Sequence, residues 1–136
     1  MRLVPPAAAR QERMDQFRRD RATAPVLRAT FPTVEQLRIE LKFEAPGSNA
    51  PTAQSHVLYP PARAYFEYPC PYRDCDGHFD LGSAVRAALC DAKHRAEGVL
   101  ECQGSRMGDR ATRRPCRLRL SYEVTAVFLG KLLTRT

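Results

Sequence analysis

The sequence predicts an α+β fold in which one helix covers an antiparallel sheet of about four strands. Apolar and polar residues alternate strictly in residues 37–44 and alternate again in residues 116–129, which is typical of strands with one buried face. Between them, apolar residues recur at helical spacing from Leu81 to Ala92. With 136 residues, the chain has room for one domain with a modest core.

The first thirty residues differ in composition from the rest of the chain. They carry seven arginines against three acidic residues, and the charged stretch QERMDQFRRDR has only Met14 and Phe17 as large apolar residues. Because so little apolar surface can be buried, we expect residues 1–30 to form a flexible basic arm. Residues 31–136 are then expected to form a single domain.

The first half of that domain predicts two strands. In 37–44, four apolar side chains share one face. A loop follows, because the stretch APGSNAPTAQS is rich in proline, glycine, serine and asparagine. The second strand is expected in two pieces, 56–59 and 62–68, and Pro60-Pro61 between them predicts an edge strand or a bulge.

The second half predicts a helix followed by two strands. Asp80 or Ser83 is expected to cap the helix, and Gly98 to end it. A short strand over 99–102 and a polar loop over 104–115 come next. In the last strand six apolar residues face one way: Leu118, Leu120, Tyr122, Val124, Ala126 and Phe128.

The net charge of +7 is unevenly distributed. Residues 31–101 are mildly acidic, whereas residues 102–119 carry six arginines against Asp109. This pattern argues against a uniformly basic nucleic-acid binder. The arginines are Arg106, Arg110, Arg113, Arg114, Arg117 and Arg119.

Two partner classes remain open for these arginines, because guanidinium groups bind phosphate and carboxylate equally well. The loop itself has no aromatic residue on which a base could stack, although Tyr65 and Tyr72 are candidates to lie nearby. A nucleic acid and an acidic protein surface are therefore both possible partners. The alternative is a solvated loop that only offsets negative charge elsewhere in the protein.

Five cysteines carry the main chemical signal. The chain has no apolar run long enough to cross a membrane, and its N-terminus lacks the apolar core of a signal peptide, so we expect a cytoplasmic protein without a membrane partner. In that reducing compartment clustered cysteines more often bind metal than form disulfides. Four of the five lie at predicted strand ends next to loops: Cys70, Cys75, Cys102 and Cys116.

Two repeated tripeptides strengthen the metal interpretation. Cys75-Asp-Gly77 and Cys102-Gln-Gly104 both read Cys-x-Gly. We expect each glycine to adopt a positive φ and to direct backbone N–H groups at the cysteine sulfur. Buried free cysteines, two disulfides and a redox pair are the competing interpretations.

The stretch from Cys70 to Gly77, together with Cys102-Gln-Gly104 and Cys116, resembles the zinc ribbons, small β-rich modules in which two cysteine pairs on opposing turns bind one zinc ion. The pairs are spaced more widely here, with four and thirteen intervening residues instead of two. The resemblance implies a structural zinc ion held by all four cysteines and a zinc-stabilised domain. No small-molecule cofactor is indicated.

Other residues offer weaker signals. Cys90 and His94 stand four apart on the expected helix and could be two ligands, although a helix cysteine and a solvated histidine are the more common case. His78 is the best substitute if one cysteine is not a ligand. No catalytic motif is present, so we expect a non-catalytic binding or adaptor protein; a thiol- or metal-dependent enzyme using Cys70 and Cys75 is the alternative.

Overall fold

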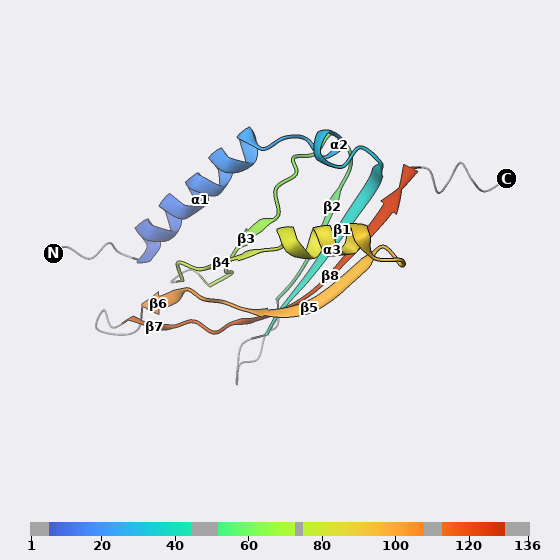
Figure 1. The fold of residues 1–136 in the computed structure, drawn as a ribbon. Coiled ribbons are helices and arrows are strands. Elements are labelled where there is room, and N and C mark those ends of the chain that lie inside the picture. Colours follow the sequence, from blue (N-terminus) through green and yellow to red (C-terminus); the bar gives the residue numbers. More distant parts are fainter. Residues whose placement is uncertain (1–5, 45–51, 73–74, 108–112, 130–136) are drawn as a thin grey trace.

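The main sheet has four antiparallel strands in the order β2-β1-β8-β5 (Figure 1). The computed structural model describes residues 6–44, 52–72, 75–107 and 113–129. The predicted α+β class with a four-stranded antiparallel sheet is confirmed, although three helices accompany the sheet instead of one. The four strands are β1 (Val34–Glu44), β2 (Thr52–Leu58), β5 (Arg95–Glu101) and β8 (Arg119–Phe128).

The core lies on one face of this sheet, and the two alternating segments build its centre. Leu37, Ile39, Leu41 and Phe43 of β1 are all buried, as predicted. The register sets them opposite the inward-facing residues of β8; Ile39, for example, pairs with Val124. From Leu37 to Phe43, β1 buries every second side chain because successive side chains point to opposite faces.

The last two strands of the sheet form the predicted hairpin. β5 pairs with β8 from Arg95 opposite Thr125 to Glu101 opposite Arg119, so its loop begins after Glu101. Beyond the main sheet, the segment that follows β5 and the segment that precedes β8 pair again as β6 (Ser105–Met107) and β7 (Arg113–Pro115). Cys102 and Cys116 lie on the two sides of this extended hairpin, as expected.

The second predicted strand is only partly confirmed. β2 is an edge strand, as the prolines indicated, but the chain leaves the sheet after Leu58, and the expected second piece, 62–68, does not rejoin it. Within the expected second piece only Glu67 and Tyr68 become strand. They belong to β3 (Glu67–Pro69), which pairs with β4 (His78–Asp80) in a separate two-stranded sheet.

The helix α3 (Gly82–Cys90) is shorter than predicted. Asp80 accepts a hydrogen bond from the Gly82 N–H at its start, and the Asp91 side chain accepts from the Lys93 N–H beyond its end. His94 then takes a left-handed conformation, with φ of 55°, which turns the chain into β5. The prediction that Gly98 ends the helix is wrong: it lies within β5, directly opposite Tyr122.

The N-terminal segment, which we expected to be a flexible arm, contains two helices. α1 (Pro6–Thr23) and α2 (Leu27–Thr30) span it, and Leu27 is fully buried in the core. Phe17 is 7% exposed, and its ring contacts those of Tyr65 and His78. The Phe17 ring and backbone hydrogen bonds to residues 60–64 dock this segment on the domain. The low apolar content of the segment did not indicate these contacts.

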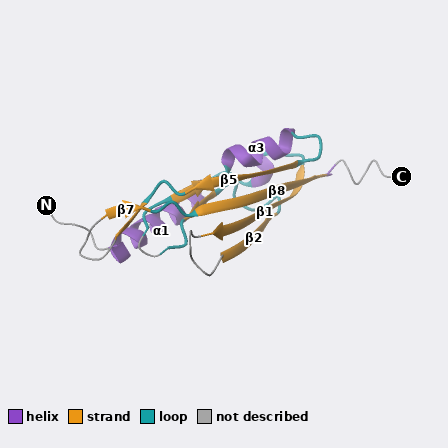
Figure 2. Cartoon of the chain, turned by 90° about the horizontal axis from the view of Figure 1, so that it is seen from below, coloured by secondary structure: helices purple, strands orange, loops and turns teal. Residues whose placement is uncertain are grey.

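The elements form two layers around the core. Figure 2 shows α3 on one side of the main sheet, and the side that faces away from α3 is the outer face. On that outer face the charged side chains of β1, such as Glu40 and Lys42, are exposed. Within the described residues, no helix combines the length and apolar character that a membrane span requires.

Candidate metal centre

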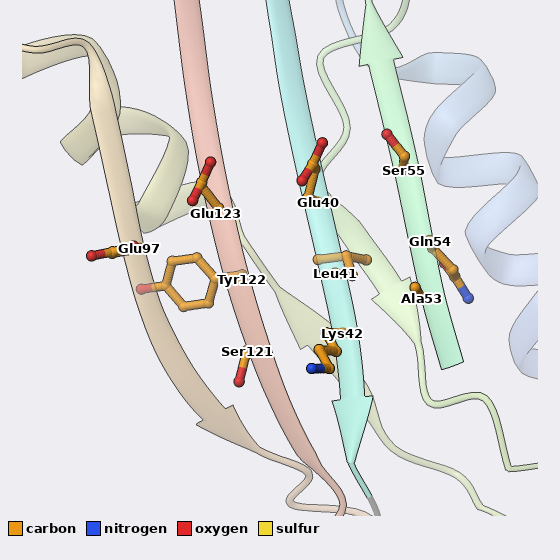
Figure 3. A pocket seen from close by; sticks show the side chains of 10 residues that line it. All are labelled: Glu40, Leu41, Lys42, Ala53, Gln54, Ser55, Glu97, Ser121, Tyr122 and Glu123. Carbon is orange, nitrogen blue, oxygen red and sulfur yellow. The ribbon is translucent and has the colours of Figure 1, made fainter. Parts of the chain in front are cut away.

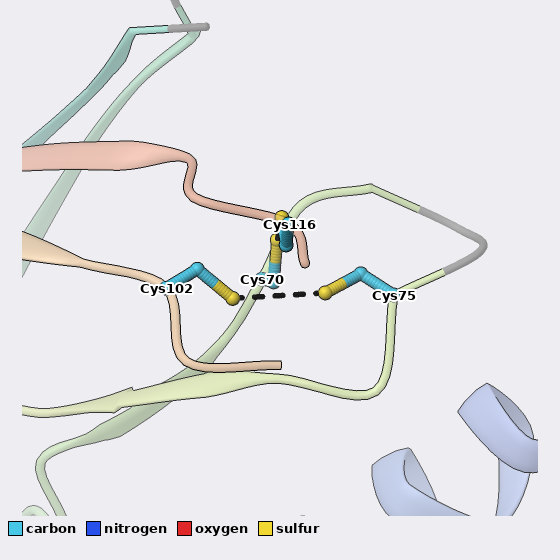
Figure 4. Close-up of side chains that lie close together, drawn as sticks. All are labelled: Cys70, Cys75, Cys102 and Cys116. Atoms are coloured by element: carbon cyan, nitrogen blue, oxygen red, sulfur yellow. Dashed lines mark hydrogen bonds between the residues drawn. The ribbon is translucent and has the colours of Figure 1, made fainter. Parts of the chain in front are cut away.

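The four cysteines at strand ends meet where two hairpins face each other (Figure 4). Cys70 follows β3 and Cys75 precedes β4, so both lie on the turn of the first hairpin. Cys102 follows β5 and Cys116 follows β7, so they lie on the two sides of the second hairpin. The fold thus brings together residues separated by up to 46 positions in the chain.

The sulfur positions match a four-coordinate site. The Sγ atoms of Cys70 and Cys116 are 3.7 Å apart, those of Cys75 and Cys102 are 3.6 Å apart, and all four lie within 4.8 Å of one another. A tetrahedron with metal–sulfur bonds of about 2.3 Å has edges of about 3.8 Å. A disulfide would need about 2.05 Å. All four cysteines are free thiols, and they are placed to hold a metal ion.

Backbone N–H groups point at the sulfurs. The Gly77 N–H donates to Cys75 Sγ at 3.3 Å, and the Gly104 N–H donates to Cys102 Sγ at 3.4 Å. The N–H groups of Tyr72 and Leu118 donate in the same way to Cys70 and Cys116 and lower their thiol pKa values. Each sulfur therefore accepts a bond from the residue two positions later, which stabilises a thiolate. The four sulfurs are those of Cys70, Cys75, Cys102 and Cys116.

The two Cys-x-Gly glycines have a different role from the predicted one. Neither has a positive φ, so that part of the expectation is wrong. Instead the two residues pack directly against each other: a side chain on Gly104 would overlap the Gly77 backbone, and one on Gly77 would overlap Cys102 Sγ. Glycine is required here because two backbones and a sulfur approach closely.

Burial opposes ionisation of these thiols. It raises the pKa of the Cys102 thiol to about 12 and also raises the pKa values of Cys70 and Cys116, more strongly than the N–H donors lower them. Four thiolates so close together would repel each other in a poorly solvated place. A bound metal cation removes this cost, because it bonds to the deprotonated sulfur.

Direct contacts join the two hairpins beside the sulfurs. Asp76 Oδ1 accepts a hydrogen bond of 2.7 Å from the Ser105 N–H, and the Asp76 N–H donates to the Ser105 carbonyl at 3.3 Å. Cys75 also forms an isolated β-bridge with Arg106. Movement of one hairpin would therefore displace ligands on the other.

The remaining candidate ligands lie elsewhere. Cys90 is exposed at the end of α3, and His94 is outside the helix with its ring against Phe128, so the two do not share a helical face, which contradicts the alternative of a Cys90–His94 ligand pair. His78 is next to the centre in sequence, but its ring lies near Glu67 and Arg13 at 3.4 Å each. It is not among the four clustered ligands.

The predicted binding arginines have diverse surroundings. Arg106 in β6 places its guanidinium carbon 3.8 Å from the ring centroid of Tyr72. Arg117 is exposed and has a φ of 56°, and the strand register sets Arg119 opposite both Glu44 and Glu101. Arg113 and Arg114 belong to β7, and Arg110 lies outside the described residues.

Sequence reasoning missed a second arginine–tyrosine pair. Tyr65, expected near the arginine loop, instead lies 5.5 Å from the Arg21 guanidinium carbon of α1. The sequence offered only two separate signals for this contact: the arginines in residues 1–30, and an aromatic residue before the first cysteine pair. Their contact depends on how α1 docks.

A shallow concavity of about 540 Å³ lies on the outer face of the main sheet (Figure 3). The register aligns Glu40, Glu123 and Glu97 across three strands, and Arg95 bonds to the latter two at 2.7 and 3.2 Å. The described residues that line it include no cysteine or histidine. Strand alternation placed these glutamates outward, but only the register aligned them.

We compared the chain with known protein families, curated proteins and solved structures. No protein-family model, curated protein or solved structure matches the chain.

Proposed function

We propose that the cysteine cluster holds one zinc ion and that the chain is a non-catalytic binding or adaptor protein organised by that ion. The observation that carries the proposal is the approach of four sulfurs at near-tetrahedral spacing where two hairpins meet. Four thiolates in a tetrahedron favour zinc over metals that prefer oxygen ligands or planar geometry. Two facing turns, each with a Cys-x-Gly tripeptide, also support the zinc-ribbon resemblance.

A structural role fits this ligand set better than a catalytic one. Four protein ligands fill a tetrahedral zinc site, whereas catalytic zinc keeps one position for water or substrate. Cys70 is fully buried and Cys75 is 2% exposed, unlike a reactive cysteine, which is accessible and has a lowered pKa. The proposal places the protein in a reducing compartment such as the cytoplasm, where thiols remain available to metal.

Metal analysis of the purified full-length chain tests the zinc site. We expect about one zinc per chain, released on acidification with uptake of protons, because each cysteine sulfur must be protonated for the metal to leave. Iron can replace zinc in overproduced protein, so reconstitution with zinc of the stripped protein accompanies the measurement. A folded protein that neither contains nor takes up zinc would refute the proposal.

The arginine-bearing hairpin β6–β7 is the proposed partner surface. It extends directly from Cys102 and Cys116, and its strands carry three arginines and no acidic residue. Such a surface attracts an anionic partner, either a nucleic acid or an acidic protein.

A further inference from the structure

We propose, building on the zinc site above, that the surface around Tyr72 and Arg106 binds single-stranded nucleic acid and that metal loading controls this binding. The Arg106 guanidinium lies over the Tyr72 ring, with 3.8 Å between its central carbon and the ring centroid. Both residues are half-buried. Unpaired bases stack on aromatic rings and on guanidinium planes, and the same guanidinium offers N–H donors to phosphate.

The charge around this stack favours a polyanion. The register of β6 and β7 sets Arg106 directly opposite Arg114, and neither strand contains a carboxylate. A phosphate chain carries the opposite charge and can bind several guanidinium groups of such a surface. The exposed Arg117, one residue beyond Cys116, adds to the same end of the molecule.

A second stack distinguishes a nucleic acid from an acidic protein partner. Arg21 and Tyr65 repeat the arginine–tyrosine arrangement at 5.5 Å, and Phe17 joins them to the first hairpin through its contact with His78. A carboxylate-bearing partner needs only arginine charge, whereas aromatic rings beside the arginines add a surface that suits bases. The observations therefore favour a nucleic acid.

The metal centre positions both members of the main stack. Tyr72 lies on the turn between Cys70 and Cys75, and Arg106 forms its backbone bridge with Cys75. A two-stranded hairpin has little stability by itself, and two such hairpins meet here. Removing the ion therefore removes one of the constraints that hold Tyr72 against Arg106.

Fluorescence anisotropy with labelled single-stranded RNA and DNA of about 12 nucleotides tests the proposal on zinc-loaded, full-length protein. We expect binding that weakens steeply between about 50 and about 200 mM salt. Tyr72→Ala should weaken it about tenfold, whereas Tyr72→Phe, which keeps the ring, should not. Comparing RNA with DNA reveals any contact to the 2′-hydroxyl.

Two arginine variants separate stacking from charge. Arg106→Lys keeps the charge but loses the plane, so we expect about tenfold weaker binding with an unchanged salt slope. Arg106→Gln should additionally lower the slope by about one. Arg38→Gln, the same charge change on the outer face of the sheet, is the matched control and should bind as the unmodified protein does.

Metal content, measured on every sample, separates this inference from the zinc proposal. Zinc-loaded protein that binds neither RNA nor DNA at low salt would overturn the inference and leave the zinc site intact. Equal weakening by Arg38→Gln and Arg106→Gln would also overturn it, as would polyglutamate binding as tightly as RNA. Unchanged RNA binding after zinc removal would refute the proposal that metal loading controls this binding.

Discussion

The contact between Gly77 and Gly104 makes a prediction that tests the metal centre without changing a ligand. In Gly104→Ala the new methyl group would overlap the Gly77 backbone and lie 2.9 Å from Asp76 Oδ1. Overpacking costs about 1–3 kcal/mol, and losing the charge-assisted bond from Ser105 to Asp76 adds about 1.5–3 kcal/mol. We expect about 2.5–6 kcal/mol in total, or zinc binding that is weaker by on the order of 100-fold or more.

The assay is competition for zinc against a chromophoric chelator, with thermal unfolding as a second measurement. Gly82→Ala is the matched control, because the same methyl group at the start of α3 meets only the ends of the Asp80 and Arg86 side chains, at 3.1 and 3.6 Å. Alanine also favours a helix over glycine by up to about 1 kcal/mol. Equal zinc affinity in the two variants would refute the close-approach argument.

Three further predictions follow from the cluster, the core and the first helix. Ile39→Ala, at a fully buried position between β2 and β8, should lower the free energy of unfolding by about 2–5 kcal/mol in chemical denaturation, whereas Lys42→Ala on the exposed face should change it by about 0.5 kcal/mol or less. Phe17→Ala should release α1 from the domain, so that trypsin cleaves the peptide bonds after the arginines of α1 more readily in a limited digestion. Unchanged digestion would contradict the docking of this helix. Serine at any clustered cysteine should abolish zinc binding and lower the melting temperature, and equal tolerance of these variants and of Cys90→Ser would contradict the ligand set, which is Cys70, Cys75, Cys102 and Cys116.

The sequence by itself determined the features that depend on local periodicity. Alternation in 37–44 and 116–129 identified the two central strands and their buried faces, because a strand exposes and buries successive residues wherever it lies. Cysteines at predicted strand ends indicated the ligand cluster, since strand ends of a hairpin lie close together. The concentration of arginines between Cys102 and Cys116 was likewise visible from composition alone.

Only the tertiary structure decided features that depend on contacts between distant segments. The docking of α1 rests on Phe17 meeting Tyr65 and His78, and the packing role of Gly104 exists only because Gly77 lies against it. Neither contact leaves a periodic signal in its own segment. Such contacts follow from how the hairpins and helices are placed in space, whereas the alternation of a strand follows from the geometry of its own backbone.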